Sequence, residues 1–174
     1  RDGRTVYARD VQTLPAALAE NVTFVLRDMM RDVVERGTAT AVRRIVGADV
    51  PVAGKTGTTD DNTDVWFVGM TPDLVAGVWM GLDKPQTIMK NAQGGRLAAP
   101  AWTAFMREVY ERKPTPPDWP RPPAITSRTI DAGTGLLHGP ACPNEDAYTD
   151  YFIAGTEPTR SCPPRTAVVS KKNP

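Results

Sequence analysis

The chain has 174 residues, of which 40% are hydrophobic and 24% charged, and its formal net charge is +1. This length is enough for one domain with a hydrophobic core, and the composition is ordinary for a globular protein. A net charge so close to zero excludes the positive field that recruits nucleic acid or an anionic membrane surface. No apolar run approaches the ~20 residues that span a bilayer, so we expect any membrane anchor to lie outside this chain.

The first residues predict part of a β-hairpin. Asp2-Gly3 is a common hairpin turn, and residues 4–8 alternate in polarity as a strand does. A hairpin also needs a strand before its turn, and this sequence offers none. We therefore expect the chain to begin in the middle of a fold.

The clearest helix follows over residues 22–34. Asn21 or Thr23 can cap its start, and Gly37 can close its end. Its apolar residues recur at helical spacing and are expected to form one buried stripe, Met29 and Met30 included. They are Val22, Val25, Leu26, Met29, Met30, Val33 and Val34. A shorter helix is predicted over residues 39–46.

Three strands are predicted next, over residues 52–59, 65–70 and 74–82. Short connections favour antiparallel neighbours, because parallel neighbours need a crossover of a dozen or more residues. A helix over residues 100–112 follows, and its expected buried stripe is Trp102, Phe105, Met106, Val109 and Tyr110. The pattern predicts an α+β fold, an antiparallel sheet flanked by helices.

Proline then interrupts the chain. Residues 113–123 contain six of the seventeen prolines, which excludes a helix or a central strand there. We interpret this stretch as an extended linker between residues 1–112 and a small, loop-rich tail over residues 124–174. The two cysteines, Cys142 and Cys162, lie in the tail; they are either unpaired and buried or joined in a disulfide. A tail with little core favours the disulfide and an oxidising, extracytoplasmic compartment.

Residues 54–59 read GKTGTT and are the segment that calls for a chemical explanation. On a strand, Thr56 and Thr58 point to the same side, and Gly57 leaves the backbone open to a ligand. An extended peptide can pair with such a strand while its carboxylate meets the two hydroxyls and the field of Lys55. The alternative is a turn rich in glycine and threonine that merely ends a strand.

A phosphate-binding loop is excluded by two observations. The pattern G-x-x-x-x-G-K-[ST] needs glycine at position 49, which is Asp49 here. It also needs a helix directly after the lysine, and Gly57 and Asp60 oppose one.

The K-T-G sequence is the third motif of penicillin-binding proteins. A longer, ordered set of segments resembles the class A members of that family, the bifunctional peptidoglycan glycosyltransferase/transpeptidases. These segments are residues 33–39 (VVERGTA), 52–59 (VAGKTGTT), 64–72 (DVWFVGMTP), 77–83 (GVWMGLD), 94–95 (GG), 98–102 (AAPAW), 130–136 (IDAGTGL), 142–143 (CP) and 151–159 (YFIAGTEPT). The resemblance covers nearly the whole chain.

The resemblance implies a serine D,D-transpeptidase that cross-links peptidoglycan stem peptides ending in D-Ala-D-Ala and is acylated by β-lactams. Residues 1–112 would be the carboxy-terminal portion of its transpeptidase domain. Lys55 would supply positive charge and help the proton relay, and Thr56 and Thr58 would bind the ligand carboxylate. Gly57 would allow close approach, and the Thr58 amide would be one oxyanion-hole donor. No cofactor, metal site or nucleic acid is expected, and the implied location is the periplasmic side of the bacterial inner membrane.

The chain departs from the family in one respect. It has no S-x-x-K and no S-x-N motif, since Ser127, Ser161 and Ser170 each lack a lysine three residues later. We expect the nucleophile and the other half of the domain upstream, and the chain alone to be inactive. Two alternatives remain: a non-catalytic penicillin-sensing module, and a serine β-lactamase, which the linker and tail disfavour.

Overall fold

The computed structural model describes residues 2, 4–5, 7–8, 10, 15–43, 49–142, 145 and 147–164. Three predicted features lie wholly or partly outside the described residues. They are the hairpin turn at Asp2-Gly3, the strand after it, and the second half of the helix over residues 39–46. We call residues 20–110 the sheet region and residues 125–162 the hairpin region.

The sheet region is built on three antiparallel strands in the order β1-β2-β3, the predicted meander. They are β1 (Ala53–Thr58), β2 (Asp64–Met70) and β3 (Val75–Gly81), and a short 3-10 turn, η1 (Asp60–Asn62), joins the first two. Residues alternate between the two faces of each strand, so Val65 and Phe67 of β2 are buried while Trp66 and Val68 between them are exposed. The predicted α+β fold is confirmed.

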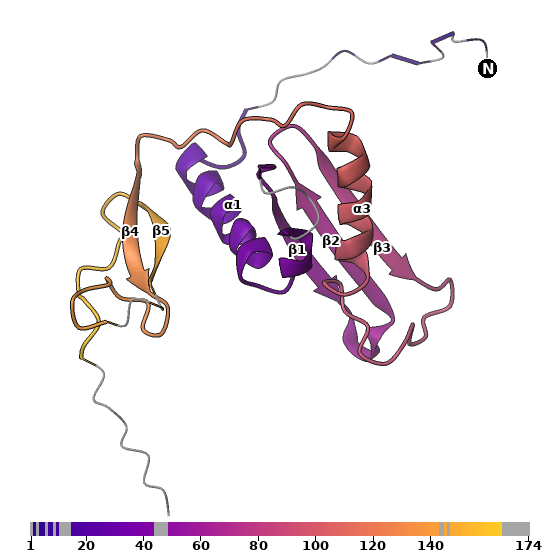
Figure 1. Cartoon of the computed structure of the whole chain (residues 1–174). Coiled ribbons are helices and arrows are strands. Elements are labelled where there is room, and N and C mark those ends of the chain that lie inside the picture. Colours follow the sequence, from indigo (N-terminus) through magenta and orange to yellow (C-terminus); the bar gives the residue numbers. More distant parts are fainter. Residues whose placement is uncertain are drawn as a thin grey trace, which may run out of the picture.

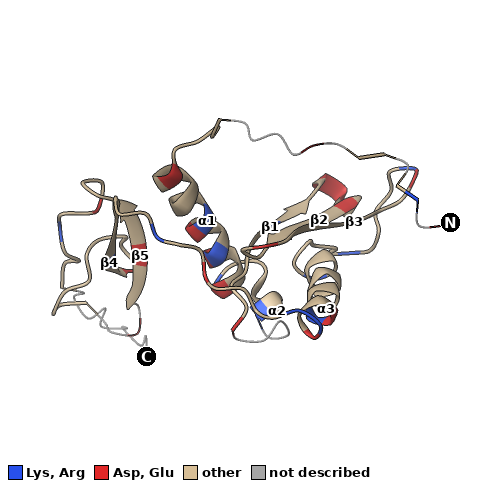
Figure 2. Cartoon of the chain, turned by 90° about the horizontal axis from the view of Figure 1, so that it is seen from above, with Lys and Arg blue, Asp and Glu red and all other residues tan. Residues whose placement is uncertain are grey.

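Among the described residues, the α-helices that accompany the sheet are α1 (Glu20–Glu35), α2 (Thr40–Arg43) and α3 (Ala98–Tyr110) (Figure 1; α2 is labelled in Figure 2). The core between them centres on α3, whose Trp102 packs edge-on against Phe67 with ring centroids 5.3 Å apart. Gly69 of β2 makes room for that indole, because a Cβ there would lie 2.5 Å from it. The indole N–H donates to the carbonyl oxygen of Ala76 at 3.0 Å, so the ring is fixed at both ends.

The predicted stripe of α1 is only partly buried. Val34 and the unpredicted Phe24 are buried, whereas Val22, Leu26 and Met29 are exposed, Met29 by 63%. Sequence periodicity shows which faces of a helix are apolar, but not which of them the rest of the chain covers. The expectation that Met29 is core is therefore wrong for this chain.

The start of α1 differs from the prediction as well. Ala19 is the N-cap and makes no side-chain capping bond. Asn21 and Thr23 lie inside the first turn, where the Thr23 hydroxyl donates back to the carbonyl oxygen of Ala19 at 3.1 Å. Glu20 in the first turn favours the helix through its charge near the positive end of the helix dipole.

On α3 the predicted stripe is right at Trp102 and Met106 and wrong at Phe105, which is 56% exposed. The open face of the sheet is apolar too, with Trp66 45% and Trp79 47% exposed and their rings 6.3 Å apart. Among the described residues, helices pack against the opposite face. The sheet region thus leaves apolar surface uncovered on a helix and on the sheet.

The hairpin region contains two strands that the sequence analysis did not predict. β4 (Ile125–Asp131) and β5 (Ala147–Ile153) pair antiparallel over their whole length. The Cys142–Cys162 disulfide closes the region, with Cα atoms 6.1 Å apart. That separation lies within the usual range for a disulfide, so the predicted bridge is present. The tail is therefore a stapled hairpin with loops.

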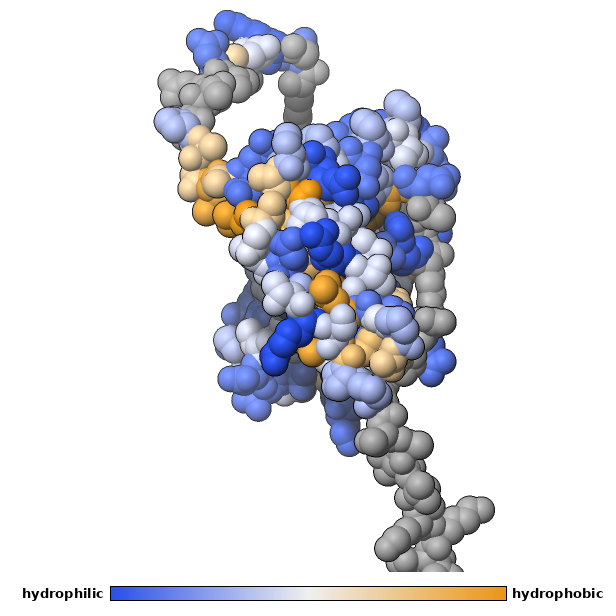
Figure 3. Space-filling model, turned by 90° about the vertical axis from the view of Figure 1, so that its left-hand side faces the viewer, coloured by the Kyte–Doolittle hydropathy of each residue, from blue (hydrophilic) through white to orange (hydrophobic). Residues whose placement is uncertain are grey.

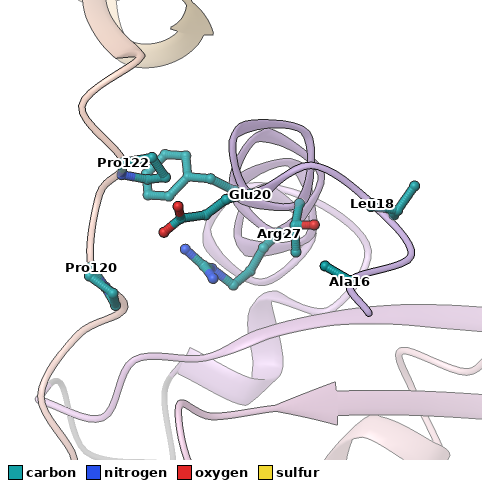
Figure 4. Close-up of a pocket in the computed structure, with 8 residues that line it drawn as sticks. Ala16, Leu18, Glu20, Arg27, Pro120 and Pro122 are labelled. Atoms are coloured by element: carbon teal, nitrogen blue, oxygen red, sulfur yellow. The ribbon is translucent and has the colours of Figure 1, made fainter. Parts of the chain in front are cut away.

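The proline-rich linker runs past α1 between α3 and β4 (Figure 1). The Trp119 ring contacts two arginines of α1, with the Arg27 guanidinium 4.8 Å and that of Arg31 5.7 Å from its centroid. Arg31 also pairs with Asp118 at 2.8 Å. A hollow of about 300 Å³ lies between the linker and the start of α1, lined by Glu20, Arg27 and two prolines among others (Figure 4).

The hairpin region contacts the outer side of α1. Tyr151 packs edge-on against Phe24, with ring centroids 5.6 Å apart, and Arg36 lies 4.0 Å over the Tyr148 ring. Acidic and basic residues are mixed along α1 (Figure 2). Seen from the hairpin side, the surface is mostly hydrophilic, with hydrophobic residues in small groups (Figure 3). No helix of the described residues has the length and hydrophobicity to cross a bilayer.

Candidate active site

The first five residues of the GKTGTT segment, 54–58, lie on β1, one of the two edge strands of the sheet. Its small residues allow β1 to pack tightly at one end, where a Cβ on Gly54 would lie 2.5 Å from the Phe67 ring. At Gly57 the nearest neighbour of such a Cβ is the Trp66 Cβ at 3.2 Å, a looser fit. Gly54 is thus needed by the core, whereas the absence of a side chain at Gly57 matters for approach to the strand.

Thr56 and Thr58 share one face of β1, opposite Phe67 and Val65 of β2. They line a cavity of about 280 Å³. The other lining residues come from three separate places in the sequence: Thr38 after α1, Asn62 of η1, and Gln93, Gly94 and Gly95 before α3. The cavity therefore has hydroxyls, amides and glycine backbone around it.

Both threonine hydroxyls are hydrogen bonded across the cavity. The Gly94 N–H donates to Thr58 Oγ1 at 3.1 Å, and the hydroxyls of Thr38 and Thr56 lie 2.8 Å apart. Sequence reasoning did not identify Thr38, Gln93 or Gly94 as lining residues. Thr38 and Gly94 stood only in segments noted for resemblance, and no local pattern pairs them with residues 18 and 36 positions away.

Lys55 lies on the opposite face of β1 from the two hydroxyls. Its register partner is the exposed Val68, and its ammonium donates to the carbonyl oxygen of Thr56 at 2.8 Å. The structure brings Thr56 and Thr58 together but does not bring the Lys55 ammonium to their hydroxyls. Lys55 instead shares the open face of the sheet with Trp66.

The backbone of β1 also offers groups at its outer edge. Thr59 donates its N–H across the ladder to the carbonyl oxygen of Asp64 at 3.0 Å. Successive N–H groups along a strand point to alternate sides, so the Thr58 N–H points away from β2. Among the described residues, no strand pairs with that edge. An extended peptide can add there as a further strand.

The shifted pKa values belong to groups elsewhere in the described chain. Hydrogen bonds from Lys113 and Tyr110 lower the pKa of Asp73 to about 2, at the turn between β2 and β3. Burial and the bond to Asp73 raise the pKa of Tyr110 to about 12. The Tyr110 hydroxyl oxygen also lies 2.6 Å from the Thr71 hydroxyl, so this cluster ties the end of α3 to the turn.

Within the described part of the chain, one group brings three potential metal-ligand atoms together: Asp131, Cys142 and Cys162. The two cysteines are bonded to each other, so they offer no thiolate ligands.

Comparison with known proteins gives two family matches. Residues 17–107 match the penicillin binding protein transpeptidase domain, and residues 121–166 match the C-terminal domain of penicillin-binding protein 1A. Penicillin-binding protein 1A of Aquifex aeolicus is 37% identical over 164 residues, 94% of this chain and 22% of the relative. The protein of that name from Pseudomonas aeruginosa is 34% identical over 156 residues, 87% of this chain and 18% of the relative.

The fold agrees with these matches. The crystal structure of penicillin-binding protein 1A from Haemophilus influenzae superposes with a TM-score of 0.72 at 28% identity, over 88% of this chain and 23% of that one. The chain thus spans about a fifth of the curated relatives' length, 22% and 18%. With more than half of its residues matched by the transpeptidase model, the chain belongs to the penicillin-binding protein transpeptidase family, of which it carries the carboxy-terminal portion.

Proposed function

We propose that this chain supplies the K-T-G strand of a serine D,D-transpeptidase, which cross-links peptidoglycan stem peptides and is acylated by β-lactams. The observation that carries the proposal is the edge strand β1, whose Thr56 and Thr58 hydroxyls face one cavity of about 280 Å³. A strand edge binds the backbone of an extended peptide, and adjacent hydroxyls bind its terminal carboxylate. Both features meet on one strand.

In the proposed reaction, a serine from outside this chain attacks the carbonyl carbon of the penultimate D-alanine. The bond to the terminal D-alanine breaks, and that D-alanine leaves after its nitrogen takes a proton. The amine of a neighbouring stem peptide then displaces the serine and closes the cross-link. A β-lactam acylates the serine in the same way as the first step, but its ring-opened product stays bound to the serine.

Each residue of the strand has a role in this proposal. The Thr58 N–H, directed to the outer edge, is one donor to the oxyanion. The hydroxyls of Thr56 and Thr58 bind the ligand carboxylate, and Gly57 lets the peptide backbone approach. Lys55 acts on the other face of β1, where its charge assists proton transfer at the serine.

The serine and the rest of the domain are proposed to cover the open apolar surfaces of the sheet region. Trp66 and Trp79 on the sheet and Met29 on α1 are between 45% and 63% exposed in this chain. Large apolar patches on a soluble protein mark surfaces that bind another segment or protein. Lys55 lies on the same face as Trp66, so a segment covering that face would bring its serine to the lysine.

The full protein is proposed to work on the extracytoplasmic side of the bacterial membrane, held by an anchor outside this chain. The Cys142–Cys162 disulfide supports an oxidising compartment. Residues 1–112, 113–123 and 124–174 are proposed as the end of the transpeptidase domain, a linker and a tail module. By resemblance to the bifunctional class, a peptidoglycan glycosyltransferase lies elsewhere in the protein.

The substitution Thr58→Val in the intact enzyme tests the proposal, because it removes one hydroxyl and leaves the backbone amide in place. Hydrogen bonds to charged groups contribute about 1.5–3 kcal/mol, so acylation by a penicillin should slow roughly ten- to a hundredfold. The substitution is nearly isosteric but also removes the bond that Thr58 accepts from the Gly94 N–H, so stability should fall by about 1 kcal/mol at most.

The measurement is the second-order acylation rate of wild type and variant beside their melting temperatures. An unchanged rate with a lowered melting temperature would assign Thr58 a structural role and remove the argument for this strand as the ligand site. Acylation of the intact protein without cross-linking of stem peptides would favour a penicillin-sensing module.

A further inference from the structure

The Thr58 hydroxyl can only accept in its hydrogen bond with Gly94. An amide N–H can only donate, so in the 3.1 Å contact between Gly94 and Thr58 the hydroxyl oxygen accepts. The hydroxyl hydrogen of Thr58 is then available to another acceptor. Among the described residues no oxygen accepts it, and the side chain borders the cavity.

Thr38 is the hydrogen-bond partner of Thr56, but here the direction of the bond is not fixed. Their hydroxyls lie 2.8 Å apart, and either can be the donor. A carboxylate only accepts hydrogen bonds, so a carboxylate in the cavity makes Thr56 donate to it. Thr38 then donates to Thr56, and hydrogen bonds aligned in one direction strengthen each other.

The loop that carries Gly94 is held in place by contact between backbones. A Cβ on Gly94 would lie 2.2 Å from the Trp66 carbonyl oxygen and 2.7 Å from that of Gly57. A Cβ on Gly95 would lie 2.0 Å from the Thr38 carbonyl oxygen. Only glycine fits at either position, and it lets the loop before α3 contact β1, β2 and the turn that follows α1.

We propose that Thr38 and Gly94 are positioning residues, which orient the Thr56 and Thr58 hydroxyls as hydrogen-bond donors toward the carboxylate of the bound ligand. This inference rests on the proposed function. Neither residue touches the reacting atoms. Both act through the threonines, so their effect depends on whether the ligand has a negatively charged carboxylate.

The experiment uses the intact enzyme and two probes, a fluorescent penicillin with its free carboxylate and the methyl ester of the same compound. The readout is the ratio of the two acylation rates, because a general loss of structure slows both and leaves the ratio unchanged. Thr38→Val should lower the acid-to-ester ratio roughly three- to tenfold. This is the usual effect of losing one hydrogen bond from a series, here Thr38 to Thr56 to carboxylate, whose last acceptor is charged.

Two further variants sharpen the result. Thr38→Ser keeps the hydroxyl and should restore the ratio to within about twofold of wild type. Thr149→Val makes the same chemical change at an exposed position of β5 and should leave the ratio as it is. If Thr38→Val does not fold, Thr38→Ala removes the hydroxyl without putting a methyl group in its place and should give the same fall in the ratio.

An unchanged ratio in Thr38→Val, or failure of Thr38→Ser to restore it, overturns the inference. If Thr58→Val lowers the ratio in the same assay while Thr38→Val does not, the proposed function stands and only the inference fails. If the wild-type enzyme is not acylated by the acid at all, the proposed function fails and the inference with it.

Discussion

The sheet region gains its stability from buried apolar side chains, among them Phe67, Met106 and Trp102, all fully buried. The hairpin region has two strands, and its buried residues include the two half-cystines. A two-stranded sheet is only marginally stable in water, so the hairpin region depends on the disulfide and on contacts with α1. The sheet region is thus stabilised mainly by hydrophobic packing, and the hairpin region mainly by a covalent cross-link.

This contrast predicts that damage to one region stays local, and Trp102→Ala should show the largest effect. It removes a fully buried indole that contacts Phe67 and donates to Ala76, so it should cost about 3–5 kcal/mol. Hydrogen exchange of the intact protein should show lost protection in β2, β3 and α3 and unchanged protection in β4 and β5. Trp119→Ala, the matched control in the linker, should cost less, about 1–2 kcal/mol, since it removes a partly exposed ring and its two cation–π contacts. Equal loss in both regions would mean that they unfold as one unit.

Replacing both cysteines by serine should have the converse effect. The bridge spans a sequence separation of 20, and by the chain-entropy argument a loop of that size contributes about 3 kcal/mol. Protection should fall in β4 and β5 and persist in the sheet region. If β4 and β5 keep their protection, contacts with α1 rather than the disulfide hold the hairpin.

The smallest expected effect concerns Asp28, which lies where α1 and the hairpin region meet. Burial is the main cause that raises its pKa from 3.8 to about 6, and Asp32 of α1 and Asp150 of β5 add to the shift while Arg31 and Arg36 oppose it. Between these two pH values the folded protein keeps a proton that the unfolded chain has released. The free energy of unfolding therefore falls as pH rises from about 4 to about 6, and the penalty is fully present above that window.

Asp28→Asn should remove this dependence and stabilise the protein at pH 7 by about 1 kcal/mol, a figure that allows for solvent screening of a half-buried group. Urea unfolding of wild type and variant at pH 4 and pH 7 measures it. A gain of the same size at both pH values would show that the charge of Asp28 is not the cause.

The sheet region was largely predictable from the sequence because its signals are local. Alternating residues and short connections indicate antiparallel strands, and β1, β2 and β3 end within one or two residues of the predicted bounds. The hairpin region was not predictable from the sequence, since a long loop separates β4 from β5 and no short turn motif connects the two strands. The exposure of Phe105 and Met29 was missed because a pattern of apolar residues does not reveal what covers them.

The candidate site divides in the same way. Lys55, Thr56, Gly57 and Thr58 were identified from residue types on one strand. Thr38 and Gly94 reach them only through the tertiary fold, across 18 and 36 positions. Strand alternation alone places Lys55 on one face of β1 and the two threonines on the other. Which of these faces stays exposed depends on where the helices pack, and the sequence does not show that.

Helix α1 has a consequence for how such proteins can exchange parts during evolution. Trp119 of the linker lies under the guanidinium of Arg27 of α1, and Tyr148 of the hairpin region lies under that of Arg36, the C-cap residue of the same helix. A recombinant that takes its tail from a relative keeps these contacts only if it inherits matching residues on α1, more than eighty positions earlier in the gene. A crossover inside the proline-rich segment breaks no helix or strand. It nevertheless separates the arginines near α1 from the aromatic residues that they contact.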